Sequence, residues 1–331
     1  MLNPTGSGGY AKVDDTSETK EVNGSRQANS SPNLSNSRRL HYGKPSYLAV
    51  SDSATIEDRT SSPSTRAATV SVFPSMLQLD LLGMRMFYGD LVTAANWLLL
   101  HIRAASQTPT LVAHINAYNF FELSRSPDLL ESLSKQGLLL FDGLGLKLAG
   151  TLHGLGWLPD INGTDLFPVV MSGLAAKRTP VYFLGSTSTN VSRVADSVAK
   201  EWPAVPIAGI RSGYFSREEE ASVVDRINAS GAELLIVARG CPLQEKFALD
   251  HLKDLKVNAI WTVGGLFDFV SGAKPRAPRW VRAARLEWFY RFKIEPKRMW
   301  RRVSIIYPWF MYRALMSSLA RSRERSAINL S

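Results

Sequence analysis

Short apolar runs alternate with stretches of helical spacing along most of the chain. Each run is apolar nearly throughout, which is typical of strands that are covered on both faces of a sheet. The strands are predicted at residues 110–115, 138–141, 181–184, 205–210, 234–238 and 259–263. The helices are predicted at residues 90–105, 120–135, 190–202, 217–230 and 243–255.

Strands and helices that alternate in this way indicate a largely parallel sheet, because each helix carries the chain back to the start of the next strand. We therefore expect an α/β fold: a Rossmann-like, mostly parallel sheet with helices on both faces. In such sheets, ligands bind where the strands end. The unusual polar residues and glycines of this chain lie at those ends, among them Asn116, Asp142, Gly185, Tyr214, Gln244, Gly264 and Asp268.

The two ends of the chain differ from this pattern. Residues 1–75 are rich in Ser, Asn, Thr and Gly and have only a short apolar patch, so they are predicted to be a disordered polar tail. Residues 1–47 contain no apolar run long enough for a signal peptide. The α/β core is predicted to span residues 76–273, and a basic, aromatic-rich helical appendage is predicted for residues 274–331.

The formal net charge of +10 comes from the appendage. Aromatic residues lie between its arginines, and an apolar stretch at 303–320 precedes further arginines. This composition favours a helix in a membrane interface, where aromatics meet headgroups and cations meet lipid phosphates. Pro308, Tyr312 and Arg313 interrupt the stretch, which disfavours a transmembrane helix. Two other interpretations stay open: a nucleic-acid surface, and a solvated basic helix with a buried aromatic face.

The composition gives little support for a metal site or for redox chemistry. A single cysteine, Cys241, excludes an intramolecular disulfide and a cysteine-based metal cluster. The five histidines show no metal-ligand spacing, and no Asp-x-Asp motif is present. We therefore expect no metal and no cofactor. An anionic leaving group would then depend on arginines for its stabilisation.

Three segments are candidates for chemistry. Asp142 lies between an apolar strand and Gly143, where its carboxylate is suited to act as a general base and equally to cap a turn. Residues 240–245 follow a strand and open a helix, so free amides there suit a diphosphate and Gln244 suits a nucleobase edge. Ordinary helix capping explains the same residues. Residues 264–268 either allow close approach of a ligand or form a tight turn.

These segments together resemble the TagA/WecG/CpsF glycosyltransferases, which build lipid-linked intermediates of cell-surface polysaccharides. The resemblance runs from about residue 77 to 302. It rests on the order and spacing of His-Ile-Asn at 114–116, Phe-Asp-Gly at 141–143, Asn-Gly-Thr-Asp-Leu at 162–166, Phe-Leu-Gly at 183–185, Gly-Tyr-Phe at 213–215, Gly-Cys-Pro-Leu-Gln-Glu at 240–245, Val-Gly-Gly-Leu-Phe-Asp-Phe at 263–269, Arg-Ala-Pro at 276–278 and Leu-Glu-Trp-Phe-Tyr-Arg-Phe at 286–292.

The resemblance implies an inverting, metal-independent transfer from a UDP-sugar to a sugar on polyprenyl diphosphate at the cytoplasmic face of the cell membrane. It assigns Asp142 as the base, with His114 and Asn116 beside it. It assigns substrate binding to Gly185, Tyr214, Gln244, Asp268, Arg291, Arg298 and Arg301, with Tyr214 near the uracil and the three arginines on phosphate. It also implies a peripheral protein that contacts the membrane through its appendage.

Two departures from the family pattern affect the expected donor. His114 replaces the usual Thr, and Leu243 replaces the usual Lys. Both positions are expected near the donor. We therefore favour a hexose donor such as glucose, and exopolysaccharide assembly as the pathway. An N-acetylmannosamine-type donor is the alternative. A nucleic-acid-binding module and an inactive membrane scaffold remain as other functions, although no nucleic acid is expected as a partner. The sequence leaves a homo-oligomer open.

Overall fold

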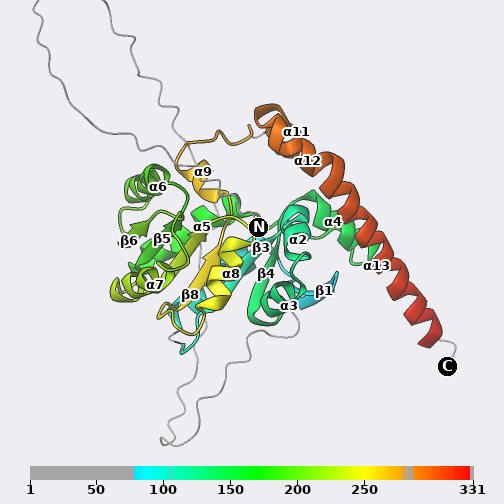
Figure 1. Ribbon diagram of the computed structural model, residues 1–331, viewed down its shortest axis with the longest axis horizontal. Coiled ribbons are helices and arrows are strands. Elements are labelled where there is room, and N and C mark those ends of the chain that lie inside the picture. The colour runs from blue at the N-terminus through cyan, green and yellow to red at the C-terminus, as the bar shows by residue number, and fades with distance from the viewer. Residues whose placement is uncertain (1–77, 105, 279, 282–285, 329–331) are drawn as a thin grey trace, which may run out of the picture. The chain divides into compact units, whose positions relative to one another are not determined.

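The computed structural model describes residues 78–104, 106–278, 280–281 and 286–328 (Figure 1). Contacts divide the chain into residues 1–57 and residues 58–331, and all of the described residues belong to the second unit. The predicted disordered tail, residues 1–75, lies outside the described residues. The boundary predicted at residue 274 stays a prediction.

The described strands form one sheet in the order β1-β2-β4-β3-β8-β7-β5-β6. Only the β1–β2 pair of this sheet is antiparallel, and the other neighbours are parallel. The predicted mostly parallel α/β sheet is therefore confirmed. The strands are β1 (Gln78–Leu81), β2 (Met84–Phe87), β3 (Thr110–Ile115), β4 (Gly137–Phe141), β5 (Val181–Gly185), β6 (Ile207–Arg211), β7 (Leu234–Ala238) and β8 (Ala259–Thr262).

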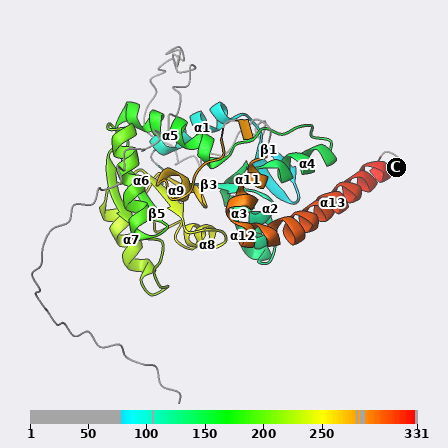
Figure 2. The ribbon, with the colours of Figure 1, turned by 90° about the horizontal axis from the view of Figure 1, so that it is seen from above.

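Helices cover both faces of the sheet, as predicted (Figure 2). One layer contains α1 (Leu91–Arg103), α5 (Gly163–Lys177), α6 (Ser188–Glu201) and α9 (Leu266–Val270). The other contains α2 (Ala117–Leu123), α3 (Pro127–Gln136), α4 (Leu144–Leu152), α7 (Glu220–Ala229) and α8 (Leu243–Asp250). The central strands β3, β4, β5, β7 and β8 are buried along their length, which explains their unbroken apolar runs.

Proline explains one error in the predicted helices. The single helix predicted at 120–135 is two helices, α2 and α3, and Pro127 is the first residue of α3. Proline has no N–H to donate and clashes with the preceding turn, so α2 cannot continue through it. The helix predicted at 243–255 is also too long, because α8 ends at Asp250.

The sequence analysis missed the strands β1 and β2 and the helices α4, α5 and α9, and the hairpin and α5 show why. The β1–β2 hairpin turns at Leu82 and Gly83, which have φ values of 55° and 76°. Both values lie in the left-handed region that a two-residue hairpin turn of this type requires. Leucine rarely adopts such values, so the sequence Leu-Gly does not predict this turn. Helix α5 contains Pro168 but buries a continuous apolar face that includes Phe167 and Met171.

The C-terminal segment is helical, as predicted. It contains α11 (Glu287–Ile294), α12 (Pro296–Arg301), the π-helical turn η2 (Arg302–Ile306) and α13 (Tyr307–Ile328). One face of α13 packs on α2 and α4, where Phe310 and Ala314 are fully buried and Phe310 meets Phe120 edge-on at 5.6 Å (Figure 1). The stretch predicted to lie in a membrane interface therefore also contributes to the core. None of the described helices is both long and apolar enough to cross a bilayer.

Candidate functional site

A cavity lies at the carboxyl ends of β3, β4, β7 and β8. The chain passes from β3 to β4 towards one edge of the sheet and then builds β5 to β8 on the other side of β3. This is the switch point at which parallel sheets open a crevice for ligands. Seven of the predicted site residues line the cavity: His114, Asn116, Asp142, Gln244, Asp268, Arg291 and Arg298.

Asp142 leaves β4 at the floor of the cavity. Its backbone N–H donates to the Ile115 carbonyl at 2.9 Å, which extends the β3–β4 ladder by one bond. Gly143 follows with a φ of 87°, a left-handed value that glycine adopts without strain. The backbone thus turns sharply after Asp142, and the carboxylate stands at the end of its strand.

Asn116 fixes one oxygen of that carboxylate. Its Oδ1 accepts from the Asn119 N–H at 2.9 Å as the N-cap of α2, which leaves Nδ2 to donate to Asp142 Oδ2 at 3.1 Å. Burial raises the pKa of Asp142, while the Asn116 hydrogen bond and the Arg291 charge oppose that rise. A carboxylate held in this way by its neighbours is suited to accept a proton from a substrate.

Asp160 supports the same turn and was missed in the sequence. Its Oδ1 accepts from the Gly143 N–H at 3.1 Å, and its Oδ2 lies 3.5 Å from Lys147 Nζ. Burial raises the pKa of Asp160, and the negative charge of Asp142 raises it further. The residue lies in a loop without a motif of its own, so only the folded chain reveals its position beside Asp142.

His114 is held by a partner from a distant strand. Trp261 on β8 donates its indole N–H to His114 Nε2 at 2.9 Å, so the neutral ring carries its proton on Nδ1. Burial lowers the pKa of His114 from 6.5 to about 4. The imidazole is therefore uncharged at neutral pH and is a poor proton acceptor there. Its place in the cavity wall supports a positioning role.

We expect the stability of the protein to fall between about pH 6.5 and pH 4 because of His114. The ring binds a proton more weakly in the folded state, where its pKa is about 4, than in the unfolded chain, where it is about 6.5. Protonation therefore favours unfolding, and this gap in pKa corresponds to about 3 kcal/mol. Urea unfolding at pH 7.5 and pH 4.5 measures the loss.

The variant His114→Gln keeps a hydrogen-bond acceptor for Trp261 but cannot titrate. Its unfolding free energy should fall less between the two pH values than that of the wild type, by up to about 3 kcal/mol. Equal losses in the two proteins would contradict the buried, neutral state of His114. The carboxylates also titrate between these pH values, but they change the unfolding free energy of both proteins equally, so their contribution cancels.

Gln244 lines the cavity, but its amide is already engaged within the protein. Gln244 Oε1 accepts from the Gly264 N–H at 3.0 Å, and Nε2 donates to Glu245 Oε1 at 2.6 Å. Glu245 is fully buried, and burial raises its pKa. The bond between Gln244 and Gly264 ties the first turn of α8 to the loop after β8. The geometry thus favours Gln244 as a support for the cavity wall rather than as a reader of a nucleobase edge.

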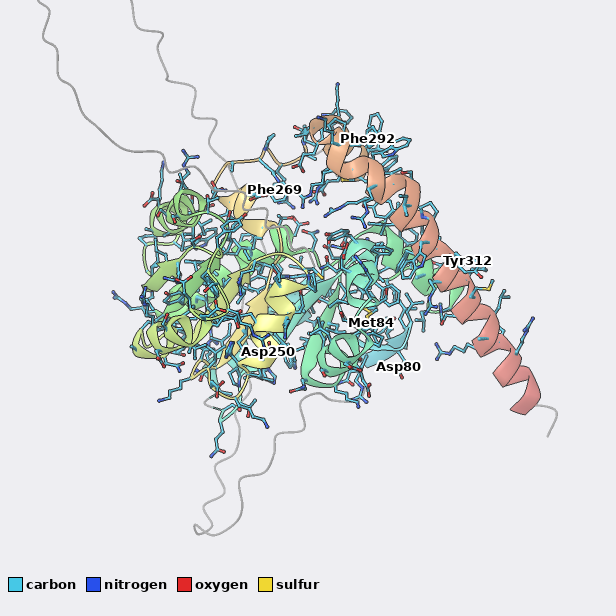
Figure 3. All side chains as sticks on the ribbon, in the orientation of Figure 1. Asp80, Met84, Asp250, Phe269, Phe292 and Tyr312 are labelled. Carbon is cyan, nitrogen blue, oxygen red and sulfur yellow. The ribbon has the colours of Figure 1, made fainter. Side chains whose placement is uncertain are left out.

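Four cationic side chains from the C-terminal half of the chain line the cavity: Lys274, Arg291, Arg298 and Arg302. The Arg302 guanidinium lies over the Tyr118 ring, 3.9 Å from its centroid, and Arg291 lies 5.1 Å from the centroid of Phe269, which is labelled in Figure 3. Burial lowers the pKa of Arg302, and the nearby charge of Arg298 lowers it further. An anion that enters the cavity would therefore stabilise these cations, because it offsets their burial and their mutual repulsion.

Arg302 lines the cavity, whereas the adjacent Arg301, which the resemblance assigned to phosphate, does not. Arg298 of α12 and Arg302 of η2 are four residues apart in a continuous helical segment, so they share one face of it, and Arg291 reaches the same cavity from α11. Residue 301 points about a quarter turn away from that face, and Arg301 is exposed and does not line the cavity. The resemblance alone could not separate two adjacent arginines.

Lys274 joins three parts of the chain around the cavity. Its Nζ lies 2.7 Å from Asp268 Oδ2 on α9 and 3.0 Å from Glu295 Oε1 at the start of α12. Glu295 also pairs with Arg298 at 3.4 Å. Asp268 therefore lies in the cavity wall as expected, and it holds the segment that carries the arginines close to the core.

Gly185 and Tyr214 do not line the cavity. A Cβ on Gly185 would lie 2.5 Å from the Ala238 carbonyl oxygen, so this glycine permits close contact between β5 and β7. Tyr214 is 78% exposed, in a loop that Arg239 holds through its 3.0 Å hydrogen bond to the Gly213 carbonyl. Their assignment to substrate binding stays a prediction.

The cavity thus combines one carboxylate at a strand end with a cluster of cations in its lining. Such a cluster suits phosphate groups, since a guanidinium can donate two parallel hydrogen bonds to their oxygens. The carboxylate suits the removal of a proton from a nearby hydroxyl. Among the described residues, no three His, Cys, Asp or Glu side chains gather as metal ligands would.

Comparison with known proteins agrees with this chemistry. The model of the glycosyl transferase WecG/TagA/CpsF family matches residues 79–324. An N-acetylglucosaminyldiphosphoundecaprenol N-acetyl-beta-D-mannosaminyltransferase of Bacillus spizizenii is 33% identical over 184 residues, or 55% of this chain and 70% of the relative. The enzyme with the same description in Bacillus subtilis is 29% identical over 196 residues, or 59% of this chain and 75% of the relative.

Proposed function

This chain belongs to the WecG/TagA/CpsF family and is a glycosyltransferase, and we propose that it moves an N-acetylmannosamine-type sugar from UDP to a sugar on polyprenyl diphosphate. The observation that carries the proposal is the Asp142 carboxylate in one cavity with the cations Arg291, Arg298 and Arg302. Both described relatives are named for transfer of N-acetylmannosamine to N-acetylglucosaminyl-diphosphoundecaprenol, which supports this donor and acceptor class.

The proposed reaction is a single displacement. Asp142 takes the proton from the acceptor hydroxyl as that oxygen forms a bond to the anomeric carbon of the donor. The bond between this carbon and the β-phosphate oxygen breaks, and its electron pair leaves with UDP. Attack from the face opposite UDP inverts the anomeric centre. The arginines stabilise the negative charge that grows on the departing diphosphate.

The hexose donor expected from the sequence has lost its main support. That expectation rested on His114 and Leu243, the two departures from the family pattern. Leu243 is 57% exposed and is absent from the cavity lining, and His114 is engaged by Trp261. The two departures therefore give no reason to prefer a hexose, and the donor named in the relatives is the better proposal. Exopolysaccharide assembly likewise stays without support.

A donor screen tests the function. We expect transfer from UDP-N-acetylmannosamine to a short-chain lipid diphosphate that carries N-acetylglucosamine, measured by mass spectrometry of the product. Faster transfer from UDP-glucose would restore the hexose donor. If no UDP-sugar reacts, the proposed activity is wrong. NMR of the new anomeric proton checks the inversion.

We also propose that the protein acts at a membrane surface, because its acceptor class is anchored there. Exposed aromatic side chains support this, with Trp280 at 71%, Phe289 at 54% and Trp300 at 65%. A nucleic-acid partner is less compatible with the site, since the cations gather in a cavity with a carboxylate. That alternative predicts salt-sensitive binding to oligonucleotides that deletion of residues 274–331 abolishes.

A further inference from the structure

We propose that Asp160 is a positioning residue for the base: it fixes the turn from which Asp142 enters the cavity, and its negative charge makes Asp142 a stronger base. Lys147 is the cation that limits this effect. The inference deepens the proposed function and rests on it, because it concerns how readily the base takes the proton of the acceptor. Neither Asp160 nor Lys147 lines the cavity.

The loop before α5 holds Asp142 from both sides. The Ile161 N–H donates to the carbonyl of Phe141, the residue before Asp142, at 2.8 Å. The Asp160 carboxylate accepts from the N–H of Gly143, the residue after Asp142, at 3.1 Å. Two adjacent loop residues thus fix the peptide groups on either side of the base, and this limits the directions that its side chain can take.

The hydrogen bond alone does not explain a carboxylate at position 160. A neutral amide or hydroxyl would accept from the Gly143 N–H at a smaller cost in lost hydration. The Gly143 nitrogen is about 2.4 Å from the Asp142 Cα, so Asp160 Oδ1, at 3.1 Å from that nitrogen, lies within about 6 Å of the Cα. The two carboxylates are therefore close enough to repel each other in a part-buried site, where water screens charges weakly.

This repulsion strengthens Asp142 as a base. Binding of one proton relieves it, so the pair takes its first proton at a higher pH than either carboxylate would alone. Burial raises the pKa of Asp160, and the negative charge of Asp142 raises it further, as this account requires. When the acceptor hydroxyl gives its proton to Asp142, the same relief favours the transfer.

Lys147 on α4 sets the size of the effect. Its Nζ lies 3.5 Å from Asp160 Oδ2 and 5.7 Å from the centroid of the Trp157 ring. The Lys147 side chain is only 12% exposed, so its charge is little screened by water. The ammonium group therefore offsets part of the repulsion between the two carboxylates, and its removal would increase that repulsion.

Other charges that act on Asp142 have partners of their own. Burial raises the pKa of Asp142; among the charges, Arg291 opposes this rise, while Glu287 and Asp165 add to it. Arg291 pairs with Glu287 at 2.8 Å, and Asp165 pairs with Arg276. Substitutions at positions 147 and 160 leave both pairs in place.

The remaining ionisable groups near the two carboxylates are also left unaltered by these substitutions. His114 of β3 and Tyr307 of α13 lie close to them, and both are neutral at pH 7. The other charged side chains of the cavity wall are Asp268, Lys274, Glu295, Arg298 and Arg302.

Carbon NMR of the Asp142 carboxyl tests the inference without any substrate. Protein labelled with ¹³C at the aspartate carboxyls is titrated, and Asp142→Asn identifies the signal of the base. Asp160→Asn keeps an acceptor for the Gly143 N–H but removes the charge, so the upper titration step of this signal should move to lower pH by about one pH unit. Lys147→Met removes the cation, so the step should move to higher pH by about half a pH unit.

Asp250→Asn is the matched control. Asp250 also pairs with a lysine, Lys246 on α8, at 2.6 Å, and its side chain is 39% exposed where that of Asp160 is 35% exposed. This variant should leave the Asp142 titration unchanged. A merely structural role predicts that Asp160→Asn behaves like the control, because asparagine keeps the hydrogen bond to Gly143.

Transfer to a short-chain acceptor connects the charge with the reaction. In each variant the acid limb of kcat/KM should move in the same direction as the NMR step, and Asp160→Asn should lower the plateau rate about threefold to tenfold. Asp160→Ala loses the Gly143 bond as well and should lower the rate roughly a hundredfold. If the wild type transfers no sugar, the proposed function fails, while the NMR titration still decides whether Asp160 and Lys147 act on Asp142.

Two results would overturn the inference. One is an Asp160→Asn protein, shown to be folded by thermal melting, whose upper step stays at the wild-type pH or moves higher. The other is a Lys147→Met protein whose step stays in place or moves lower. Because Lys147 does not bond to the Gly143 turn, its variant decides the question by itself if Asp160→Asn fails to fold.

Discussion

Asp142→Asn should lower kcat by about 10²–10⁴-fold, because asparagine cannot accept the proton that the acceptor hydroxyl must lose. The amide has nearly the shape of the carboxylate and can still meet Asn116, so the fold should survive. Initial rates of transfer to a short-chain acceptor measure the effect. The same variant tests whether the chain is an inactive scaffold, since a scaffold would function equally well with asparagine at this position.

Binding provides the control for Asp142→Asn. Calorimetric titration with UDP should give nearly the wild-type Kd, because in the proposed reaction the base meets the acceptor and the cations meet the diphosphate. A large loss of UDP binding would show instead that Asp142 supports the donor site. Full transfer activity in the variant would exclude Asp142 as the base.

The pH profile of the wild type adds a further check. Burial raises the pKa of Asp142, so the base becomes protonated at a higher pH than an exposed aspartate. Only the ionised form accepts a proton, and kcat/KM should therefore fall as the pH decreases through this raised pKa. His114, with its pKa of about 4, should not set this limb, so His114→Gln should leave its midpoint in place.

Arg302→Gln should lower kcat/KM by about a hundredfold, whereas Arg301→Gln should change it less than about threefold with a water-soluble acceptor. Arg302 lines the cavity, and its guanidinium is held over Tyr118, so the charge is positioned to stabilise a departing diphosphate. Arg301 is exposed outside the cavity. The two residues are adjacent in sequence, which makes the pair a stringent test of the helix orientation.

Steady-state kinetics and thermal melting decide between the two arginines. Both variants should melt within a few degrees of the wild type, because neither arginine joins a carboxylate in the described contacts. Arg302→Lys should recover part of the lost activity through its charge, but not the bidentate geometry. A greater loss in Arg301→Gln than in Arg302→Gln would show that the cavity contains the other arginine during turnover.

Part of the fold and of the site was predictable because the signals are local. Unbroken apolar runs indicate strands covered on both faces, and their alternation with helices indicates a parallel sheet. Asn116 and Asp142 follow such strands directly, and parallel strands bring their carboxyl ends to one edge. Their contact at 3.1 Å follows from the pairing of β3 with β4.

Other parts depend on partners that are distant in sequence. Burial by distant segments keeps His114 uncharged and the Trp261 indole sets its tautomer, while Glu245 and Gly264 occupy the amide of Gln244. Asp160 reaches the turn after Asp142 from a loop with no motif. A pattern of residue types along the chain contains no information about these contacts.

The amino-acid sequence by itself determined the fold class, the family resemblance and the strand end that holds Asp142, since each depends on local periodicity or on motif spacing. Only the tertiary structure decided which arginine enters the cavity, that His114 is neutral, and that α13 has one face on the core and the other exposed. The physical reason is that helix phase, burial and charge environment depend on how distant segments pack, and these set the chemistry of a side chain as much as its identity does.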